Sequence, residues 1–279
     1  MSEPMSGLIH LTDAEFLELT RFVKQKYGID LSKKRVLIEG RLSNLLRERG
    51  LTTFQDYLKL IKNDSSGAEV TGLLNRITTN HSYFMREQEH FSFLQKQVLP
   101  YLCRVHARDH DLRIWSAGCS AGQEAYTIAM AIDDYFGPEK SKWDTTILAT
   151  DISMKVLDKA RRAVYSADNL SGLPKVWQDK YLTKQPDGQY QVCEKLRREV
   201  VFKPFNLMET FSFRKPFDLI FCRNVMIYFD NPTRDKLVKQ FYDVTAPGGY
   251  LFIGHSEVIN RDITNYQFLE PAIYQKREK

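Results

Sequence analysis

The sequence predicts an α/β protein in which a doubly wound, mostly parallel sheet follows an all-helical N-terminal domain. From Arg113 onward, short apolar runs alternate with helical patterns, which is typical of parallel strands joined by helices. Before that point, apolar residues recur at helical spacing and no strand pattern occurs. The turn Pro186-Asp187-Gly188 between two short alternating runs predicts a small antiparallel β flap. We expect a helical domain over residues 1–85, an α/β domain over 86–279 and a β insert at about 175–200.

Length and composition are those of an ordinary globular protein. The 279 residues, 43% hydrophobic and 27% charged, suffice for one α/β domain and a smaller partner. No apolar run is long enough to cross a membrane, and the N-terminus lacks a signal-peptide pattern. The four cysteines are scattered without a C-x-x-C pair, which favours reduced thiols. We therefore expect a cytoplasmic protein that does not insert into the membrane. His106 and His110 have no third ligand beside them, so no metal site is predicted.

Four helices are expected in the N-terminal domain. A capping box at Thr12–Glu15 opens the first, and Gly28 ends it. A second helix is predicted from about Leu31 to Arg49, with its leucines and Ile38 facing inward. The third begins after Thr53 and the fourth spans about 70–77.

The second helix has a basic outer surface. Two acids, Glu39 and Glu48, accompany six basic residues there, namely Lys33, Lys34, Arg35, Arg41, Arg47 and Arg49. One interpretation is a solvated surface. The other is a docking face for an acidic partner, either nucleic acid or an acidic protein helix. The basic residues do not share one stripe and the nearby aromatics belong to the core, so nothing singles out nucleic acid.

In the α/β domain, a polar loop leads into a helix that begins near Glu87. The first strand, at Arg113–Ser116, precedes a helix at Glu124–Phe136. A second strand, at 145–150, precedes a helix at 152–163 that Ser153 caps. Further strands are expected at 199–202, 217–222, 250–254 and 272–275, with a helix at 232–245 that ends at Pro247-Gly248-Gly249.

The β insert interrupts this alternation. Its hairpin pairs 181–184 with 189–192, and Leu196–Val200 is expected to extend it as a flap on the main sheet. A surface hairpin without function is one interpretation. The other is an exposed edge that accepts a strand from a partner.

The loop bracketed by Gly118 and Gly122 joins the first strand to its helix, a position typical of a nucleotide site. Glycine lets the backbone approach a ligand closely. Neither G-x-x-x-x-G-K-[ST] nor G-x-G-x-x-G is present. The loop has no basic residue for a phosphate, and Glu124 opens the helix instead. S-adenosylmethionine fits, because it carries an ammonium and a sulfonium and no phosphate.

Polar residues follow the next strands at the same edge of the predicted sheet. Asp151 ends the second strand and can accept hydrogen bonds from both hydroxyls of a ribose, although a lone Asp there more often caps a helix. Asn206-Leu207 follow the third strand, where an adenine edge or a simple turn is expected. Arg223-Asn224 end the fourth strand, with Tyr228 one turn further on. Strand ends at this edge face the ligand crevice of open α/β folds.

Four motifs together resemble one family. They are Thr78-Thr79-Asn80 through Arg86-Glu87, Trp115-Ser116-Ala117 through Glu124, Phe217-Asp218 through Phe229, and Gly254-His255-Ser256-Glu257. The sequence resembles the CheR family of chemoreceptor glutamate methyltransferases over nearly its full length. The resemblance implies a sheet of the class I S-adenosylmethionine-dependent methyltransferase type.

The resemblance also implies the cofactor contacts. By motif they fall on Asn80, Ser82, Arg86, Glu124, Asp151, Asn206, Leu207, Arg223 and Asn224, beside Gly118 of the glycine loop. Relatives often have Thr where Ser82 stands, and the hydroxyl is kept. Relatives also vary the small residues between the two loop glycines.

The implied reaction moves a methyl group from S-adenosylmethionine to glutamate carboxylates of chemoreceptors, giving glutamyl methyl esters and S-adenosylhomocysteine in sensory adaptation. Glutamate is already ionised at neutral pH, so no general base is needed. Arg86 is expected to orient the incoming carboxylate. Tyr228 is expected to pack its ring near the sulfonium, with a plain core aromatic as the other interpretation.

The resemblance assigns the basic helix to the receptor's methylation helices, and the hairpin at Gly188 could hold a receptor C-terminal peptide, as in some relatives. A nucleic-acid methyltransferase is the main alternative function. Amino-group enzymes of that class favour Asn/Asp-Pro-Pro-aromatic after the fourth strand, where Cys222–Val225 stand here. A non-catalytic adaptor that binds S-adenosylmethionine is a third, which the retained motifs disfavour.

Overall fold

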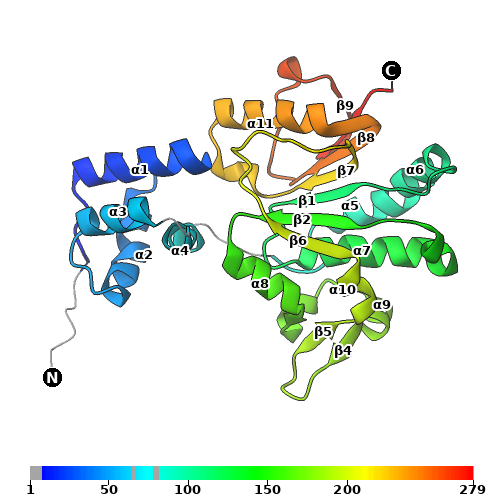
Figure 1. The fold of residues 1–279 in the computed structure, drawn as a ribbon, viewed down its shortest axis with the longest axis horizontal. Coiled ribbons are helices and arrows are strands. Elements are labelled where there is room, and N and C mark those ends of the chain that lie inside the picture. The colour runs from blue at the N-terminus through cyan, green and yellow to red at the C-terminus, as the bar shows by residue number, and fades with distance from the viewer. Residues whose placement is uncertain (1–7, 65–66, 78–81, 279) are drawn as a thin grey trace. The chain divides into compact units, whose positions relative to one another are not determined.

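The computed structural model describes residues 8–64, 67–77 and 82–278, and its chain forms two compact units (Figure 1). The helical unit comprises Met1–Asn80 and Tyr228–Asp230. The α/β unit comprises His81–Ile227 and Asn231–Lys279. None of the described helices is long and apolar enough to cross a membrane.

The helical unit contains the expected helices α1 (Asp13–Tyr27), α2 (Arg35–Glu48), α3 (Phe54–Asn63) and α4 (Ala68–Ile77). The capping box is confirmed, because Thr12 and Glu15 each accept the other's backbone N–H through their side chains. Gly28 ends α1 with φ at 73°, a conformation that glycine adopts without steric cost. Thr53 caps α3 by accepting the N–H of Asp56.

The predicted start of α2 at Leu31 is wrong by four residues. Asp30 accepts the N–H of Ser32 through its side chain, and Lys34 donates its N–H to the carbonyl of Leu31. This local turn delays the helix until Arg35, since the Asp side chain competes with helical hydrogen bonds. Lys33 therefore precedes the helix.

Three residues that are distant in sequence complete the helical unit. Within Tyr228–Asp230, Phe229 forms an antiparallel bridge with Ile29. The backbone N–H of Asp30 donates to the carbonyl of Tyr228 at 2.8 Å. The sequence contains no signal for this pairing, because it joins segments about two hundred residues apart.

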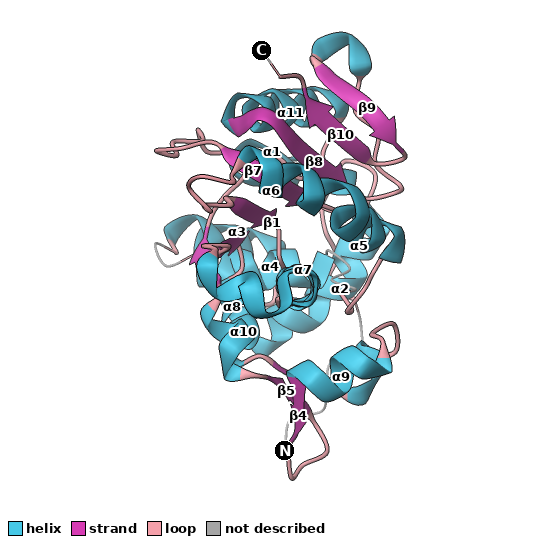
Figure 2. Cartoon of the chain, turned by 90° about the vertical axis from the view of Figure 1, so that its right-hand side faces the viewer, coloured by secondary structure: helices cyan, strands magenta, loops and turns pink. Residues whose placement is uncertain are grey.

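The α/β unit is built on a seven-stranded sheet with the order β6-β2-β1-β7-β8-β10-β9. The first five strands in that order pair in parallel, and β10 is antiparallel to both neighbours, so the predicted mostly parallel sheet is confirmed. Figures 1 and 2 show α7 and α8 on one side of this sheet and α11 on the other. The strands are β1 (Ile114–Ala117), β2 (Ile147–Asp151), β6 (Val200–Pro204), β7 (Phe217–Cys222), β8 (Thr245–Ile253), β9 (Tyr266–Glu270) and β10 (Ile273–Lys276).

The helices of this unit follow the expected alternation. Ser153 caps α8 by accepting the N–H of Val156, as predicted. The helices are α5 (Gln88–Phe93), α6 (Leu99–Val105), α7 (Gln123–Phe136), α8 (Met154–Arg162), α9 (Lys175–Tyr181), α10 (Glu194–Arg198) and α11 (Asn231–Val244), and a π-helical turn at Leu94–Val98 joins α5 to α6.

Two predictions about the β insert are wrong. Leu196–Val200 is not a flap strand, because Glu194–Arg198 forms α10, which the ion pairs of Glu194 with Arg197 and Arg198 support. The flap is a separate sheet, in which β5 (Tyr190–Val192) pairs with β4 (Leu182–Lys184) and with β3 (Val164–Tyr165).

The glycines after α11 do not form a loop. Pro247, Gly248 and Gly249 lie inside β8, which begins directly after the helix. A Cβ on Gly249 would come within 3.0 Å of the carbonyl oxygens of Ala246 and Phe217, so a residue without a side chain is needed there.

An aromatic cluster fixes the strands that carry the site. Trp115 of β1 is fully buried and donates its indole N–H to Thr150 of β2 at 2.9 Å. The rings packed around it belong to Phe205, Phe211, Phe213, Phe217 and Phe241. The carboxyl ends of β1 and β2 are thereby held side by side.

Candidate active site

The glycine loop crosses the carboxyl ends of β1 and β2. The backbone N–H groups of Gly118 and Cys119 both donate to the carbonyl of Thr150 at 2.8 Å. The φ angles of Gly118 and Gly122 are 80° and 91°. A Cβ at Gly118 would lie 2.4 Å from Val225 Cγ2, and one at Gly122 would lie 2.9 Å from Ala160 Cβ. Both glycines are therefore required by backbone conformation and by close packing against neighbouring segments.

Asp151 ends β2 and connects two loops. Its carboxylate accepts the N–H of Ser120 through one oxygen and the N–H of Ser153 through the other, each at 2.9 Å. Burial raises its pKa, against the effect of these hydrogen bonds. The two oxygens of a carboxylate together offer about four acceptor positions. Asp151 can therefore accept hydrogen bonds from a diol such as a ribose.

Glu124 lies in the first turn of α7. Its carboxylate accepts a hydrogen bond from Ser116 Oγ at 2.7 Å and one from Arg223 Nη1 at 3.2 Å. Burial raises the pKa of Glu124, and the guanidinium of Arg223 opposes that shift. The carboxylate is thus fixed by β1 on one side and by the end of β7 on the other.

Arg223 follows β7 and its side chain is only 2% exposed. Its guanidinium lies between two carboxylates, 2.9 Å from Glu87 Oε2 and 3.2 Å from Glu124 Oε2. It also donates to the backbone carbonyl of Arg86 and lies over the ring of Phe91, 5.5 Å from the centroid. Two acids therefore share one buried cation.

Asn224 adopts a left-handed conformation, with φ at 59°. Its side-chain amide donates to Glu87 Oε1 at 3.1 Å, and its backbone N–H donates to Glu257 Oε2 at 2.9 Å. Glu257 also accepts the N–H groups of Gly254 and Ile227. The loop after β7 is therefore held by carboxylates from two other segments.

The charges suit a cationic ligand better than a phosphate. The carboxylates of Glu87, Glu124 and Asp151 surround this edge of the sheet, and Arg223 is already paired with two acids. No Lys or Arg lies between the loop glycines. A phosphate would meet net negative charge, whereas an ammonium or a sulfonium would be attracted.

Comparison with known proteins agrees with this chemistry. Residues 80–274 match the CheR methyltransferase SAM-binding domain, and residues 14–78 match the CheR methyltransferase all-alpha domain. The chemotaxis protein methyltransferase of Borreliella burgdorferi is 44% identical over 96% of each chain. That of Escherichia coli is 36% identical over 91% of this chain and 87% of its own.

The chain belongs to the CheR methyltransferase family. It is therefore an S-adenosylmethionine-dependent methyltransferase with a SAM-binding domain. Among solved structures, the glycopeptide N-methyltransferase MtfA aligns with 62% of this chain and 50% of its own at 12% identity, with a TM-score of 0.34, a likeness too weak to bear on the activity.

The CheR-family fold brings several predicted cofactor residues together. Glu124, Arg223 and Asn224 are joined by hydrogen bonds, directly or through Glu87, and Asp151 holds the glycine loop beside them. The carbonyl of Ser82 accepts a hydrogen bond from the Gln123 side chain at 3.1 Å, which ties its segment to the start of α7. Their roles in binding stay predictions.

Several other predicted site residues are not joined to this hydrogen-bond network by the contacts described here. Asn206 accepts the N–H of Met208 in a local turn, and Leu207 is 9% exposed. Asn80 lies outside the described residues. Tyr228 groups with the helical unit, where the ammonium of Lys34 lies 5.3 Å from its ring centroid. Gly188, with φ at 81°, lies in the turn between β4 and β5.

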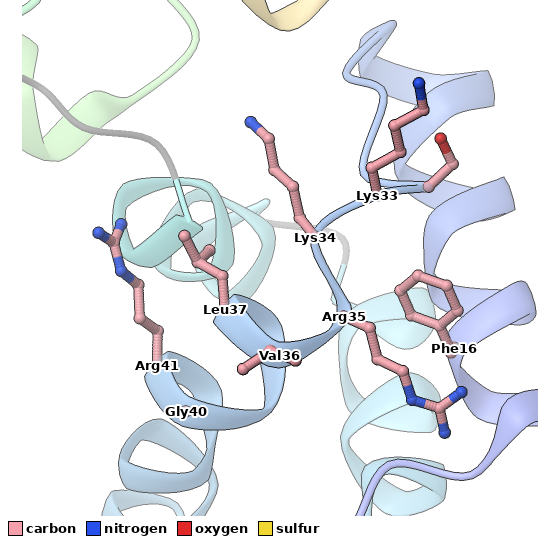
Figure 3. A pocket seen from close by; sticks show the side chains of 9 residues that line it. Phe16, Lys33, Lys34, Arg35, Val36, Leu37, Gly40 and Arg41 are labelled. Atoms are coloured by element: carbon pink, nitrogen blue, oxygen red, sulfur yellow. The ribbon is translucent and has the colours of Figure 1, made fainter.

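The six basic residues predicted as a docking face divide into two sets. Four of them line a groove of about 750 Å³, together with apolar side chains including Val36, which is 84% exposed (Figure 3). The other two lie elsewhere, since Arg47 bonds to Asn44 and Arg49 pairs with Glu69. The groove is lined by Phe16, Ser32, Lys33, Lys34, Arg35, Val36, Leu37, Gly40 and Arg41.

Two acids in the site, Glu87 and Glu257, were not predicted from the sequence to hold it together. Glu87 and Glu257 both lie in motifs that carried the family resemblance, yet no role was assigned to either. Their partners are backbone N–H groups and side chains from distant segments. A pairing of that kind leaves no periodic or spacing signal in the sequence.

Proposed function

We propose that this CheR-family enzyme methylates glutamate side chains of chemoreceptors in the cytoplasm, giving glutamyl methyl esters and S-adenosylhomocysteine in sensory adaptation. The observation that carries the proposal is the pairing, in one chain, of an acid-lined site at the strand ends with a basic groove in the helical unit. The first suits a cationic methyl donor and the second suits an acidic protein partner. The relatives' shared name, chemotaxis protein methyltransferase, supports the same assignment.

The acceptor chemistry explains why no general base is required. A glutamate carboxylate, with an ordinary pKa of about 4.3, is already a nucleophile at neutral pH. S-adenosylmethionine supplies the methyl group on its sulfonium. The residues of this chain then have to align the reacting atoms and exclude water, and alignment alone can contribute roughly 7–11 kcal/mol.

Different residues of the site are proposed to contact different parts of the cofactor. Asp151 would accept hydrogen bonds from the ribose hydroxyls through its spare lone pairs, and Asn206-Leu207 would border the adenine. Glu124, Arg223 and Asn224 would hold the amino-acid end. Ser82, Asn80 and Gly118 complete the proposed contacts.

Arg86 and Tyr228 are proposed to act nearest the reacting atoms. The Arg86 guanidinium would orient the incoming carboxylate. Tyr228 would turn a ring face toward the sulfonium.

Receptor binding is assigned to two surfaces. Lys33, Lys34, Arg35 and Arg41 of the groove would attract acidic methylation helices. The hairpin at Gly188 offers β4, an edge strand among the described residues, to which a receptor C-terminal peptide could add by β-augmentation.

Transfer of a radiolabelled methyl group tests this function. The purified protein is incubated with labelled S-adenosylmethionine and membranes that contain chemoreceptors. We expect label on the receptor that mild base releases as methanol, since carboxyl methyl esters hydrolyse readily. Base-stable label on added RNA or DNA, with none on receptor, would instead identify a nucleic-acid methyltransferase.

A further inference from the structure

Glu87 forms a junction between three segments of the α/β unit. Its Oε2 accepts hydrogen bonds from Arg223 Nη2 at 2.9 Å and Nε at 3.3 Å. Its Oε1 accepts from Asn224 Nδ2 at 3.1 Å and from the backbone N–H of His255 at 3.2 Å. One carboxylate therefore joins the segment before α5, the end of β7 and the loop after β8.

The backbone of Glu87 has an unusual conformation, which the contacts of its side chain maintain. The residue occupies the N-cap position of α5, yet its side chain makes no capping hydrogen bond. Its φ is 57°, in the left-handed region that non-glycine residues rarely adopt. Such a conformation persists where surrounding contacts over-determine it, which the four hydrogen bonds to the carboxylate do here.

A metal site is the competing interpretation. Ligand atoms of Glu87, His90 and His255 lie within 4.8 Å of one another, and Nδ1 of buried His90 lies 3.5 Å from Glu87 Oε2. However, the lone pairs of Glu87 already serve four donors, and the Arg223 guanidinium would repel a second cation. Burial, with the charge of Arg223, lowers the pKa of His90 to about 3. His90 is thus a buried, neutral side chain next to the ion pair of Glu87 with Arg223.

We propose that Glu87 is a positioning residue for the cofactor site, acting by fixing the guanidinium of Arg223 and the amide of Asn224. Within residues 82–278 of the α/β unit, Glu87 is the side chain that bonds to both residues, since Glu124 contacts Arg223 and Glu257 contacts the backbone of Asn224. The inference rests on the proposed cofactor role of Arg223 and Asn224. It does not depend on which protein accepts the methyl group.

The chemistry of the four contacts provides a sharp test. All four partners of Glu87 are donors, so a Gln at this position keeps the shape but turns an NH₂ group toward donors. Glu87→Gln should weaken S-adenosylhomocysteine binding, measured by calorimetry, by roughly tenfold or more. Glu87→Asp keeps the charge but shortens the reach, and should weaken binding in the same direction.

A double-mutant cycle separates positioning from general stability. Arg223→Met alone should weaken binding, and adding Glu87→Gln to it should weaken binding less than Glu87→Gln does in the wild-type protein, because only the Asn224 amide is left for Glu87 to position. Glu199→Gln is the matched control, since Glu199 accepts from the buried Lys140 ammonium at 2.7 Å before β6. It should lower the unfolding temperature while leaving S-adenosylhomocysteine affinity unchanged.

Three outcomes of these binding measurements would contradict the inference or one of its premises. Glu87→Gln within twofold of wild type, or an effect that adds in full on the Arg223→Met background, overturns the inference. Failure of the wild-type protein to bind S-adenosylhomocysteine would remove the proposed function and the inference together. Normal binding by Arg223→Met would remove the premise about Arg223 and leave receptor methylation standing.

Discussion

Glu257 Oε2 accepts the backbone N–H of Asn224 at 2.9 Å and so fixes the residue that follows the buried strand β7 and Arg223. The same oxygen accepts the N–H of Gly254 at 2.6 Å, and Oε1 accepts that of Ile227 at 3.1 Å. Glu257 is only 4% exposed. Burial raises its pKa, while the backbone N–H groups act in the opposite direction. A buried carboxylate thereby replaces regular secondary structure in holding the loop that carries Asn224.

Replacing this carboxylate should destabilise the protein. Glu257→Gln presents an amide NH₂ to backbone N–H groups and leaves at least one of them unsatisfied, at a cost of about 1–3 kcal/mol. Urea unfolding measures the loss. Glu270→Gln, at an exposed position in β9, is the control and should be nearly neutral. Equal stabilities of the two variants would show that the N–H contacts of Glu257 contribute little.

Removing the Arg86 side chain should impair catalysis. Arg86→Ala is expected to lower the rate of receptor methylation by about a hundredfold, because a poorly aligned carboxylate seldom reaches the methyl group. Steady-state methylation and S-adenosylhomocysteine calorimetry separate rate from cofactor affinity. Arg86→Lys keeps the charge without the planar fork and should recover part of the rate. A variant with wild-type rate and affinity would refute the role.

Reversing charge in the groove should weaken receptor binding. Lys33→Glu combined with Arg41→Glu is expected to raise the KM for receptor several-fold with little change in kcat, since the role proposed for the groove is to attract the receptor and not to take part in the methyl transfer. The difference from wild type should shrink as salt rises. Lys59→Glu, elsewhere in the helical unit, is the control. An unchanged KM would indicate that the basic groove is simply a solvated surface.

His106 should make stability depend on pH. Its two ring nitrogens lie 3.0 Å from Asp109 and Asp218, and only the protonated ring can donate to both. Burial lowers the pKa of His106, but the two carboxylates outweigh it and raise the pKa above its ordinary value of 6.5. A raised folded-state pKa adds stability that is fully present below the unfolded pKa and is lost as pH rises through the folded pKa.

The comparison is between wild type and His106→Asn. Urea unfolding should show the largest advantage of wild type below pH 6.5 and a shrinking advantage above it. Burial raises the pKa of Asp218, so the contribution of Asp218 to folding stability also declines as pH rises. An advantage that grew with pH would contradict the charged pairing.

The sequence by itself determined the order of elements and the main features of the site. Local signals were enough for this. The Thr12–Glu15 capping box, the Gly118–Gly122 loop and Asp151 at a strand end are each encoded within a few residues by caps, periodicity and turn chemistry. Predictions failed where local signals compete, as at the start of α2 and at α10, since short helices and strands differ little in propensity.

Only the tertiary structure decided which distant groups meet. Glu87 reaches Arg223 across 136 residues, Tyr228–Asp230 joins the helical unit, and two of the six basic residues lie outside the groove. These contacts depend on how the strands are ordered and on how the loops beyond them pack. A hydrogen bond between segments far apart in the chain leaves no pattern in either segment, so the partners of a buried charge become visible only in the folded chain.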